Sequence, residues 1–140
     1  MAIHSKITVV KLDTSGGVLT DISTYCNKVS MPRSLDLNDV TVFGSTSKQY
    51  LPGFADGDVS MGGPWTRAQD QFFSPIFAAF QAGTLASVSF EYGPEGADAA
   101  DVKHSCELIM TDYEPGSDVG NPVEWSAKFK VTGAITVATY

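Results

Sequence analysis

The sequence predicts a mainly β fold: an antiparallel β-sandwich or partly closed barrel of about seven strands, with one flanking α-helix. Apolar and polar residues alternate with a period of two through most of the chain, as they do in strands that bury one face. Turn-forming glycine, proline and aspartate residues gather between these segments. A single stretch, residues 66–83, has instead the spacing of an amphipathic helix.

The length and composition favour one domain, expected to span residues 1–140. Hydrophobic residues make up 43% of the chain and charged residues 18%, which excludes a disordered protein. No apolar run approaches the roughly 18 residues of a membrane-spanning helix. The N-terminal segment lacks the apolar stretch and cleavage site of a signal peptide, so we expect synthesis in the cytoplasm.

Two elements are expected near the N-terminus. Residues 3–12 alternate in polarity and predict a first strand, which a turn at residues 14–17 ends. Residues 18–25 are ambiguous, because Asp21 or Ser23 can also cap a single helical turn there.

The central part of the chain, residues 29–65, predicts a strand, a long excursion and a second strand. Residues 34–38 and 57–61 alternate as half-buried strands do. The connection at about residues 37–56 is expected to turn at Gly44-Ser45, Pro52-Gly53 and Asp56-Gly57, and compact domains rarely keep so long a connection without a function. It carries apolar residues that a lone domain gains little by exposing: Val42, Phe43, Tyr50, Leu51 and Phe54.

One helix is predicted to begin near Thr66 and to end at Gly83. Pro75 lies inside it, so we expect either a kink at Ser74 or two short helices. No polar groups converge on its apolar face, which argues against a ligand pocket and for packing on a sheet. That face consists of Phe72, Phe73, Ile76, Phe77 and Phe80.

Three more strands are predicted, at residues 86–92, 102–112 and 123–139. Turn regions rich in glycine and acidic residues separate them. The last strand alternates strictly, with its apolar residues at odd positions, and a bend or bulge is expected at Gly133.

The chain is acidic, with 16 acidic and nine basic residues and a net charge of −7. Half of the 16 acidic residues lie between residues 91 and 118. Such a surface does not grip nucleic acid by neutralising its phosphates. A wall of like charge does let nucleic acid slide past without sticking, although solubility alone is the simpler interpretation.

No cofactor or metal site is predicted. Cys26 and Cys106 are too few for a disulfide scaffold, and we expect both to be free, buried thiols. His4 and His104 lie far apart, and no cysteine–histidine cluster has the spacing of metal ligands. A glycine-rich phosphate loop followed by lysine is also lacking.

No catalytic set of residues is recognisable either. The sequence contains no Gly-x-Ser-x-Gly motif. Asp56 and Asp58 are interpreted as part of a turn that leads into a strand, rather than as calcium ligands. Asp98 and Asp101 lie in a loop without the apolar cover that would raise a carboxyl pKa for acid catalysis. We therefore predict that the protein is not an enzyme.

Three segments carry a resemblance to a known family. Residues 39–44 read DVTVFG, residues 48–57 read KQYLPGFADG, and residues 125–135 read WSAKFKVTGAI. They resemble the major tail tube proteins of long-tailed, siphovirus-like bacteriophages. In that family a DVT-x-FG element precedes a K-x-[FY]-[IL]-x-G-[LF]-x-D-G element, and the third segment resembles the final strand. The resemblance extends from about residue 22 to the end of the sequence.

The resemblance implies a structural virion protein of the phage tail. Members of the family form rings, usually of six subunits, which stack into a hollow tube that carries the genome. The long loop between two early strands, here about residues 37–56, reaches the neighbouring ring. We expect inter-ring contacts from Asp39, Thr41, Phe43, Lys48, Tyr50, Leu51 and Phe54. The polar strand faces offer three candidates for lining the channel, which are Glu91, Glu107 and Glu124.

The partners implied are other copies of the chain and further tail proteins, such as the tape measure, tail tip and terminator proteins. DNA is expected to pass through the channel without specific binding. The implied location is the virion tail, assembled in the host bacterial cytoplasm, and no cofactor is implied.

Two other functions remain open. The first is a tube or terminator component of a related contractile tail or injection system, because these share the fold. The second is a β-sandwich module that binds a glycan or another surface ligand, which would expose aromatic residues on a strand face. Trp125 and Phe129 instead fall on the apolar positions, and Trp65 alone is expected to be exposed.

Overall fold

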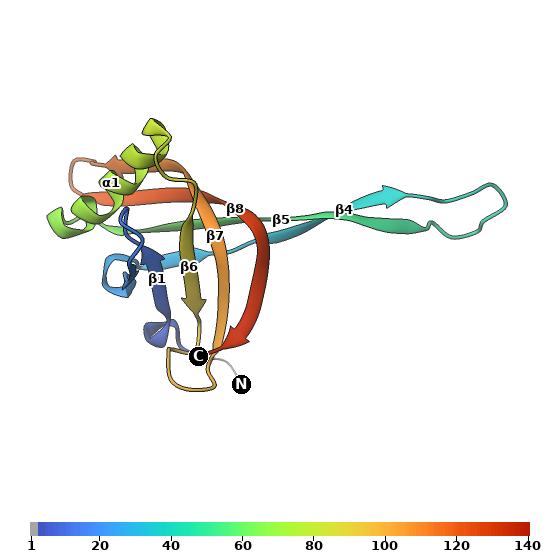
Figure 1. Cartoon of the computed structure of the whole chain (residues 1–140), viewed down its shortest axis with the longest axis horizontal. Coiled ribbons are helices and arrows are strands. Elements are labelled where there is room, and N and C mark those ends of the chain that lie inside the picture. Colours follow the sequence, from blue (N-terminus) through green and yellow to red (C-terminus); the bar gives the residue numbers. More distant parts are fainter. Residues whose placement is uncertain (1–2) are drawn as a thin grey trace.

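The computed structural model describes residues 3–140, which form one eight-stranded sheet and one α-helix (Figure 1). Helix α1 spans Arg67–Ala82, and two short 3₁₀ turns are η1 (Ser5–Ile7) and η2 (Ser23–Tyr25). The predicted mainly β class with one helix is confirmed, with eight strands rather than about seven. The strands are β1 (Val9–Asp13), β2 (Leu19–Asp21), β3 (Lys28–Ser30), β4 (Arg33–Asp39), β5 (Tyr50–Pro64), β6 (Val88–Gly93), β7 (Val102–Gly116) and β8 (Glu124–Thr139).

The sheet curls without closing. Its strand order is β2-β1-β6-β7-β8-β5-β3, and β4 pairs with β5 outside this path. All its neighbouring strands are antiparallel. Residues 22–27 cross the gap between the two ends, where the backbone N–H of Ile22 donates to the Val10 carbonyl (2.8 Å) and that of Asn27 to the Gly62 carbonyl (2.9 Å). The sheet is therefore a partly closed barrel with an opening between β1 and β3.

One face of the sheet and one side of α1 bury the core. The rings of Phe73 on α1 and Trp125 on β8 lie 4.5 Å apart between their centroids. The Trp125 indole N–H also donates to the Tyr25 carbonyl (3.1 Å), so this large side chain is buried with its polar atom paired. The predicted apolar helix face packs as expected, with Phe73 and Ile76 fully buried.

Helix α1 begins and ends where the sequence predicts. The Thr66 side chain accepts a hydrogen bond from the Gln69 backbone N–H, and Gly83 adopts a left-handed conformation (φ +75°) as the C-terminal cap. Pro75 lies inside one continuous helix, so the two-helix alternative is wrong. The buried side chains on both sides of Pro75 pack on the sheet, and this outweighs the roughly 3 kcal/mol that an interior proline costs. α1 is not long and apolar enough to cross a membrane, nor is any other helix in the described residues.

The prediction of a first strand at residues 3–12 is wrong for the first half of that segment. The turn η1 occupies that part, and β1 begins only at Val9. The reason is that Val9 is opposite Gly93, the last residue of β6, so no strand is present for earlier residues to pair with. The ambiguous residues 18–25 divide into the short strand β2 and the single turn η2.

The long strand β8 contains the irregularity that was predicted at Gly133. The pairing with β7 shifts between the pairs Ser105–Thr136 and Glu107–Thr132, and Gly133 has φ +86°. Glycine alone adopts such a backbone angle at little cost, which explains its place in the bulge. Beyond the bulge the alternation no longer buries side chains fully, since Val137 is 53% exposed.

Candidate assembly surfaces

Strand β4 and the first half of β5 leave the sheet as a long two-stranded ribbon (Figure 1). Residues 58–64 of β5 pair with β8, whereas residues 50–57 pair only with β4. The ribbon comprises residues 33–57, and nearly all of its residues are exposed, except at the inner end, where Gly57 is buried beside Val131 and Ile135 of β8. Two strands alone are marginally stable in water, so this ribbon has the form of an element made to pack against another molecule.

Half of the predicted excursion at residues 37–56 is thus strand. Only residues 40–49 connect β4 to β5 without strand structure. The Pro52-Gly53 pair does not form a turn, because it lies where the β4–β5 pairing shifts between Leu35 and Leu37. A hypothetical side chain at Gly53 would lie 3.1 Å from Asp36 Cβ, so a glycine fits this bulge.

The ribbon displays an unusual amount of apolar surface. Phe43 at its tip is fully exposed and Phe54 is 86% exposed. Leu35 and Leu37 are on one face, while Leu51, which pairs with Asn38, is on the other. Apolar side chains therefore cover both faces, as expected for a segment that binds within a protein interface. Besides Phe43 and Phe54, the exposed apolar residues of the ribbon are Leu35, Leu37, Val40, Val42, Tyr50 and Leu51.

The seven residues expected to make inter-ring contacts gather in the outer part of the ribbon. Asp39 and Tyr50 form the last pair of the β4–β5 ladder. The Thr41 backbone N–H donates to the Asp39 carboxylate (2.9 Å), and the Thr41 hydroxyl, followed by this bond, lowers the pKa of Asp39. The Gln49 backbone N–H donates to Thr41 Oγ1 (2.8 Å), which ties the two sides of the connection together. Phe43 and Lys48 lie in the connection itself.

Polar contacts hold the ribbon where it joins the sheet. The Lys130 ammonium group contacts the carboxylates of Asp56 (2.8 Å) and Asp58 (3.1 Å). The hydrogen bond from Lys130 lowers the pKa of Asp56, and the Asp56 and Asp58 carboxylates raise that of Lys130. Arg33, the first residue of β4, donates from Nη2 to the imidazole of His104. Sequence reasoning missed these contacts, because they join residues 71 and 74 positions apart and leave no local pattern.

The three candidate channel residues share the sheet face that points away from the core. Glu91 pairs with Ser105, Glu107 with Ser89, and Glu124 with Gly116. Their chain neighbours Phe90, Leu108 and Trp125 point into the core. By the same register, this polar face also carries basic residues, which are Lys11, Lys28, Lys103, Lys128 and Lys130. Charges of both signs therefore lie on it, and Lys103 is 3.6 Å from Glu91.

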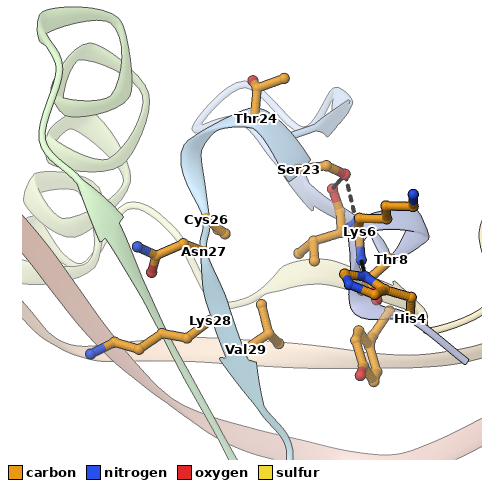
Figure 2. A pocket seen from close by; sticks show the side chains of 11 residues that line it. His4, Lys6, Thr8, Ser23, Thr24, Cys26, Asn27, Lys28 and Val29 are labelled. Atoms are coloured by element: carbon orange, nitrogen blue, oxygen red, sulfur yellow. Dashed lines mark hydrogen bonds between the residues drawn. The ribbon is translucent and has the colours of Figure 1, made fainter.

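An open groove of about 630 Å³ lies between β1 and β3, where the sheet does not close (Figure 2). His4, Lys6 and Thr8 line one wall, and residues 23–29 form the opposite one. None of the 11 lining residues is acidic. We call this cavity the edge groove.

The described residues contain no cluster of histidine, cysteine, aspartate or glutamate that could hold a metal ion. The two cysteines are free thiols, as predicted, and burial raises their pKa to about 12 for Cys26 and about 11 for Cys106. Such thiols are poor nucleophiles at neutral pH.

No protein-family model and no curated protein sequence matches the chain. Solved structures do match it. A chain from the tail of an empty gene transfer agent particle with C6 symmetry aligns with a TM-score of 0.79 at 15% identity, over 99% of this chain and 100% of that one. A chain of the SPP1 tail tube aligns at 0.75 and 12% identity, over 99% and 80%. A chain from the sheath–tube complex of an extracellular contractile injection system aligns at 0.74 and 11% identity, over 99% and 93%. Over nearly its whole length, the chain has the tail tube fold.

Proposed function

We propose that this protein is a structural virion protein that forms the tube of a phage tail. The observation that carries the proposal is the exposed β4–β5 ribbon on a chain that takes the tail tube fold from end to end. An isolated subunit gains nothing from a ribbon that is apolar on both faces, whereas a subunit that repeats along a tube buries it at every contact.

In the proposed assembly the subunits form rings, six to a ring, and the rings stack into a hollow conduit for genome delivery. A number of six is supported by the C6 symmetry of the gene transfer agent tail whose chain has the same fold. The interface is heterologous, because the ribbon of one copy meets a different surface of the next. Such contacts repeat without limit along an axis, as a tube requires.

The ring-to-ring contact is made by the outer ribbon, through Asp39, Thr41, Phe43, Lys48, Tyr50, Leu51 and Phe54. Burying a fully exposed phenylalanine or leucine contributes about 1.5–3 kcal/mol. Phe43 and Phe54 are therefore the main sources of affinity, and the polar residues set the register.

The polar face of the sheet lines the channel, with Glu91, Glu107 and Glu124 among its residues. Carboxylates repel the phosphates of passing DNA, and the interspersed lysines are partly neutralised by carboxylates on the same face. DNA thus moves through without specific binding. The remaining partners are other tail proteins, such as the tape measure, tail tip and terminator proteins, and assembly takes place in the host bacterial cytoplasm. No cofactor or catalytic step is involved.

Negative-stain electron microscopy of the purified protein across a concentration series, with size-exclusion chromatography, tests this proposal. Rings or long hollow tubes are the expected result. A protein that stays monomeric at every concentration and binds a glycan would contradict it and favour the ligand-binding module. The structure offers that module little support, since Trp125 and Phe129 are each 2% exposed and present no aromatic strand face.

A contractile injection system is the second candidate. Chains from an anti-feeding prophage baseplate (TM-score 0.72) and from a contractile sheath–tube complex (0.74) share the fold with the siphovirus tube. The tube of a contractile system is enclosed by a sheath. A sheath gene beside the gene for this protein, and tubes that bind the purified sheath protein, would support this candidate over a flexible tail.

A further inference from the structure

The apolar ribbon requires a receiving surface, and we infer that the edge groove of a second copy is that surface. This inference rests on the proposed tube function and specifies its ring-to-ring contact. The ribbon points away from the body of its own chain (Figure 1), while the groove lies in the body beside β1. A chain therefore does not fill its own groove, and the contact joins two copies.

The groove offers an open strand edge. In the described part of the chain β3 pairs only with β5, on one side, and its other side borders the groove. The sheet is interrupted at this point, so an added strand would continue it toward β1. Extended segments commonly bind proteins by adding to such an edge, with alternate side chains entering the pocket beside it. The ribbon is extended and has an open edge of its own along β4.

The charges of the two surfaces are complementary. Lys6 lies on one wall of the groove, and none of the lining residues is acidic (Figure 2). The outer part of β4 carries the carboxylates of Asp36 and Asp39, and both side chains are exposed. The Thr41 contacts favour the ionised form of Asp39. Attraction between these groups orients the ribbon as it approaches the groove.

The apolar components also match. Val29 and Tyr92 line the groove beneath its polar rim. Phe43 and Tyr50 on the ribbon are exposed and need apolar cover. Seating the ribbon therefore buries apolar side chains of both copies while the carboxylates stay near Lys6.

Photocross-linking within assembled tubes tests the inference. A benzophenone amino acid replaces Phe43, tubes are isolated and irradiated, and mass spectrometry locates the cross-linked peptides. The expected products join the ribbon of one copy to residues 4–10 or 23–29 of another. A probe at Ala78, on the exposed side of α1, is the matched control and should not cross-link to these segments. Tubes whose Phe43 probe reacts elsewhere, for example with the acidic loop at residues 94–101, would overturn the inference but leave the tube function standing.

Charge exchange provides a second test that does not depend on the probe. Lys6→Glu and Asp36→Lys/Asp39→Lys should each raise the protein concentration needed for tube formation about tenfold, because like charges then face each other. Combining all three substitutions should restore assembly. Arg67→Glu, on α1 and outside both surfaces, should have no effect. Loss of assembly that the combined variant does not restore would count against the contact, whereas a wild-type protein without rings or tubes would refute the tube function itself.

Discussion

The guanidinium group of Arg33 donates a hydrogen bond to Nδ1 of His104, across 71 positions of sequence. An arginine side chain has only donors, so Nδ1 must accept and the imidazole is neutral with its proton on Nε2. Desolvation, and secondarily the positive charge of Arg33, lower the pKa of His104. The contact joins the first residue of the ribbon to β7 and therefore helps to fix the direction in which the ribbon leaves the sheet.

This contact predicts a pH-dependent stability. The pKa of His104 is lower in the folded protein than its unfolded value of about 6.5, so the unfolded state binds more protons in the interval between the two. The free energy of unfolding should therefore fall as the pH drops below about 6.5. The His104→Gln variant keeps an acceptor for Arg33 but does not titrate, so its stability should depend less on pH. Urea denaturation of both proteins at about pH 5 to 8 measures this, and equal slopes would exclude the role of His104.

The Lys130 contacts predict the local stability of the ribbon. Lys130→Met removes the ammonium group that neutralises Asp56 and Asp58 and leaves the two carboxylates near each other. We expect faster amide hydrogen exchange over residues 50–58 and a higher pKa of Asp56, with little change in the core strands. Lys128→Met is the control on the same face, because Lys128 forms no ion pair with a described residue. Equal exchange in both variants would show that the ion pairs do not hold the ribbon.

A partly buried hydrogen-bond network joins α1 to the sheet. The Tyr113 hydroxyl donates to the Asp70 carboxylate (2.7 Å) and accepts from the Gln69 side-chain amide (3.1 Å), while Gln69 is fully buried. The hydrogen bond from Tyr113 lowers the pKa of Asp70. Burial of the Tyr113 ring, and secondarily its hydrogen bond to Asp70, raises the pKa of Tyr113 to about 12.

Tyr113→Phe should lower the free energy of unfolding by about 1–3 kcal/mol, because it leaves the buried Gln69 amide without a partner. Removing both polar groups, in Tyr113→Phe/Gln69→Leu, should cost less than the sum of the two single changes. Urea denaturation of the three variants tests this coupling. Strict additivity would mean that the contact between the two side chains contributes nothing.

Gly63 is predicted to tolerate no side chain. A Cβ atom there would lie 2.3 Å from the Tyr25 carbonyl oxygen, and backbone atoms surround the position. Gly63→Ala should therefore destabilise the fold by about 1–3 kcal/mol or more, through displacement of the chain between η2 and β3. Gly116→Ala is the control, since its Cβ would meet open space. Calorimetry that finds the same melting temperature for Gly63→Ala and wild type would disprove this close approach.

The ribbon tip should matter for assembly and not for folding. Phe43→Ala/Tyr50→Ala removes two exposed side chains. The melting temperature of the monomer should therefore change no more than it does after an ordinary surface substitution. Tube formation, seen by negative-stain electron microscopy, should be lost or need far more protein. Val119→Ala, at an equally exposed apolar residue in the β7–β8 connection, should leave tubes intact. Normal tubes from the double variant would show that the ribbon tip is not part of the interface between rings.

Alternating polarity predicted the strands wherever one face is buried. In β8 the odd positions Trp125, Ala127 and Phe129 are buried as expected, because β7 and β5 flank that half of the strand. The first half of β5 could not be recognised in this way, since neither face of the ribbon is buried within the chain. Its Pro52-Gly53 and Asp56-Gly57 pairs indicated turns but occupy extended backbone.

The seven candidate ribbon residues were identified from the family resemblance, and they do gather in one place. The edge groove, which we infer to receive them, was not predictable, because it joins residues near the N-terminus to residues 23–29 and to Tyr92 on β6. Proximity of this kind depends on how the sheet curls. The contacts of Arg33 and Lys130 were missed for the same reason.

The continuity of β5 has a mechanical consequence. One uninterrupted strand runs from the outer ribbon at Tyr50 to Pro64, just before α1, and its last seven residues pair with β8. Tension applied at the ribbon is directed along the axis of this strand. The hydrogen bonds to β8 lie across that axis, so they bear the load together in shear instead of opening one after another. A pull on the ribbon is thus delivered to the β5–β8 ladder, which resists it as a unit.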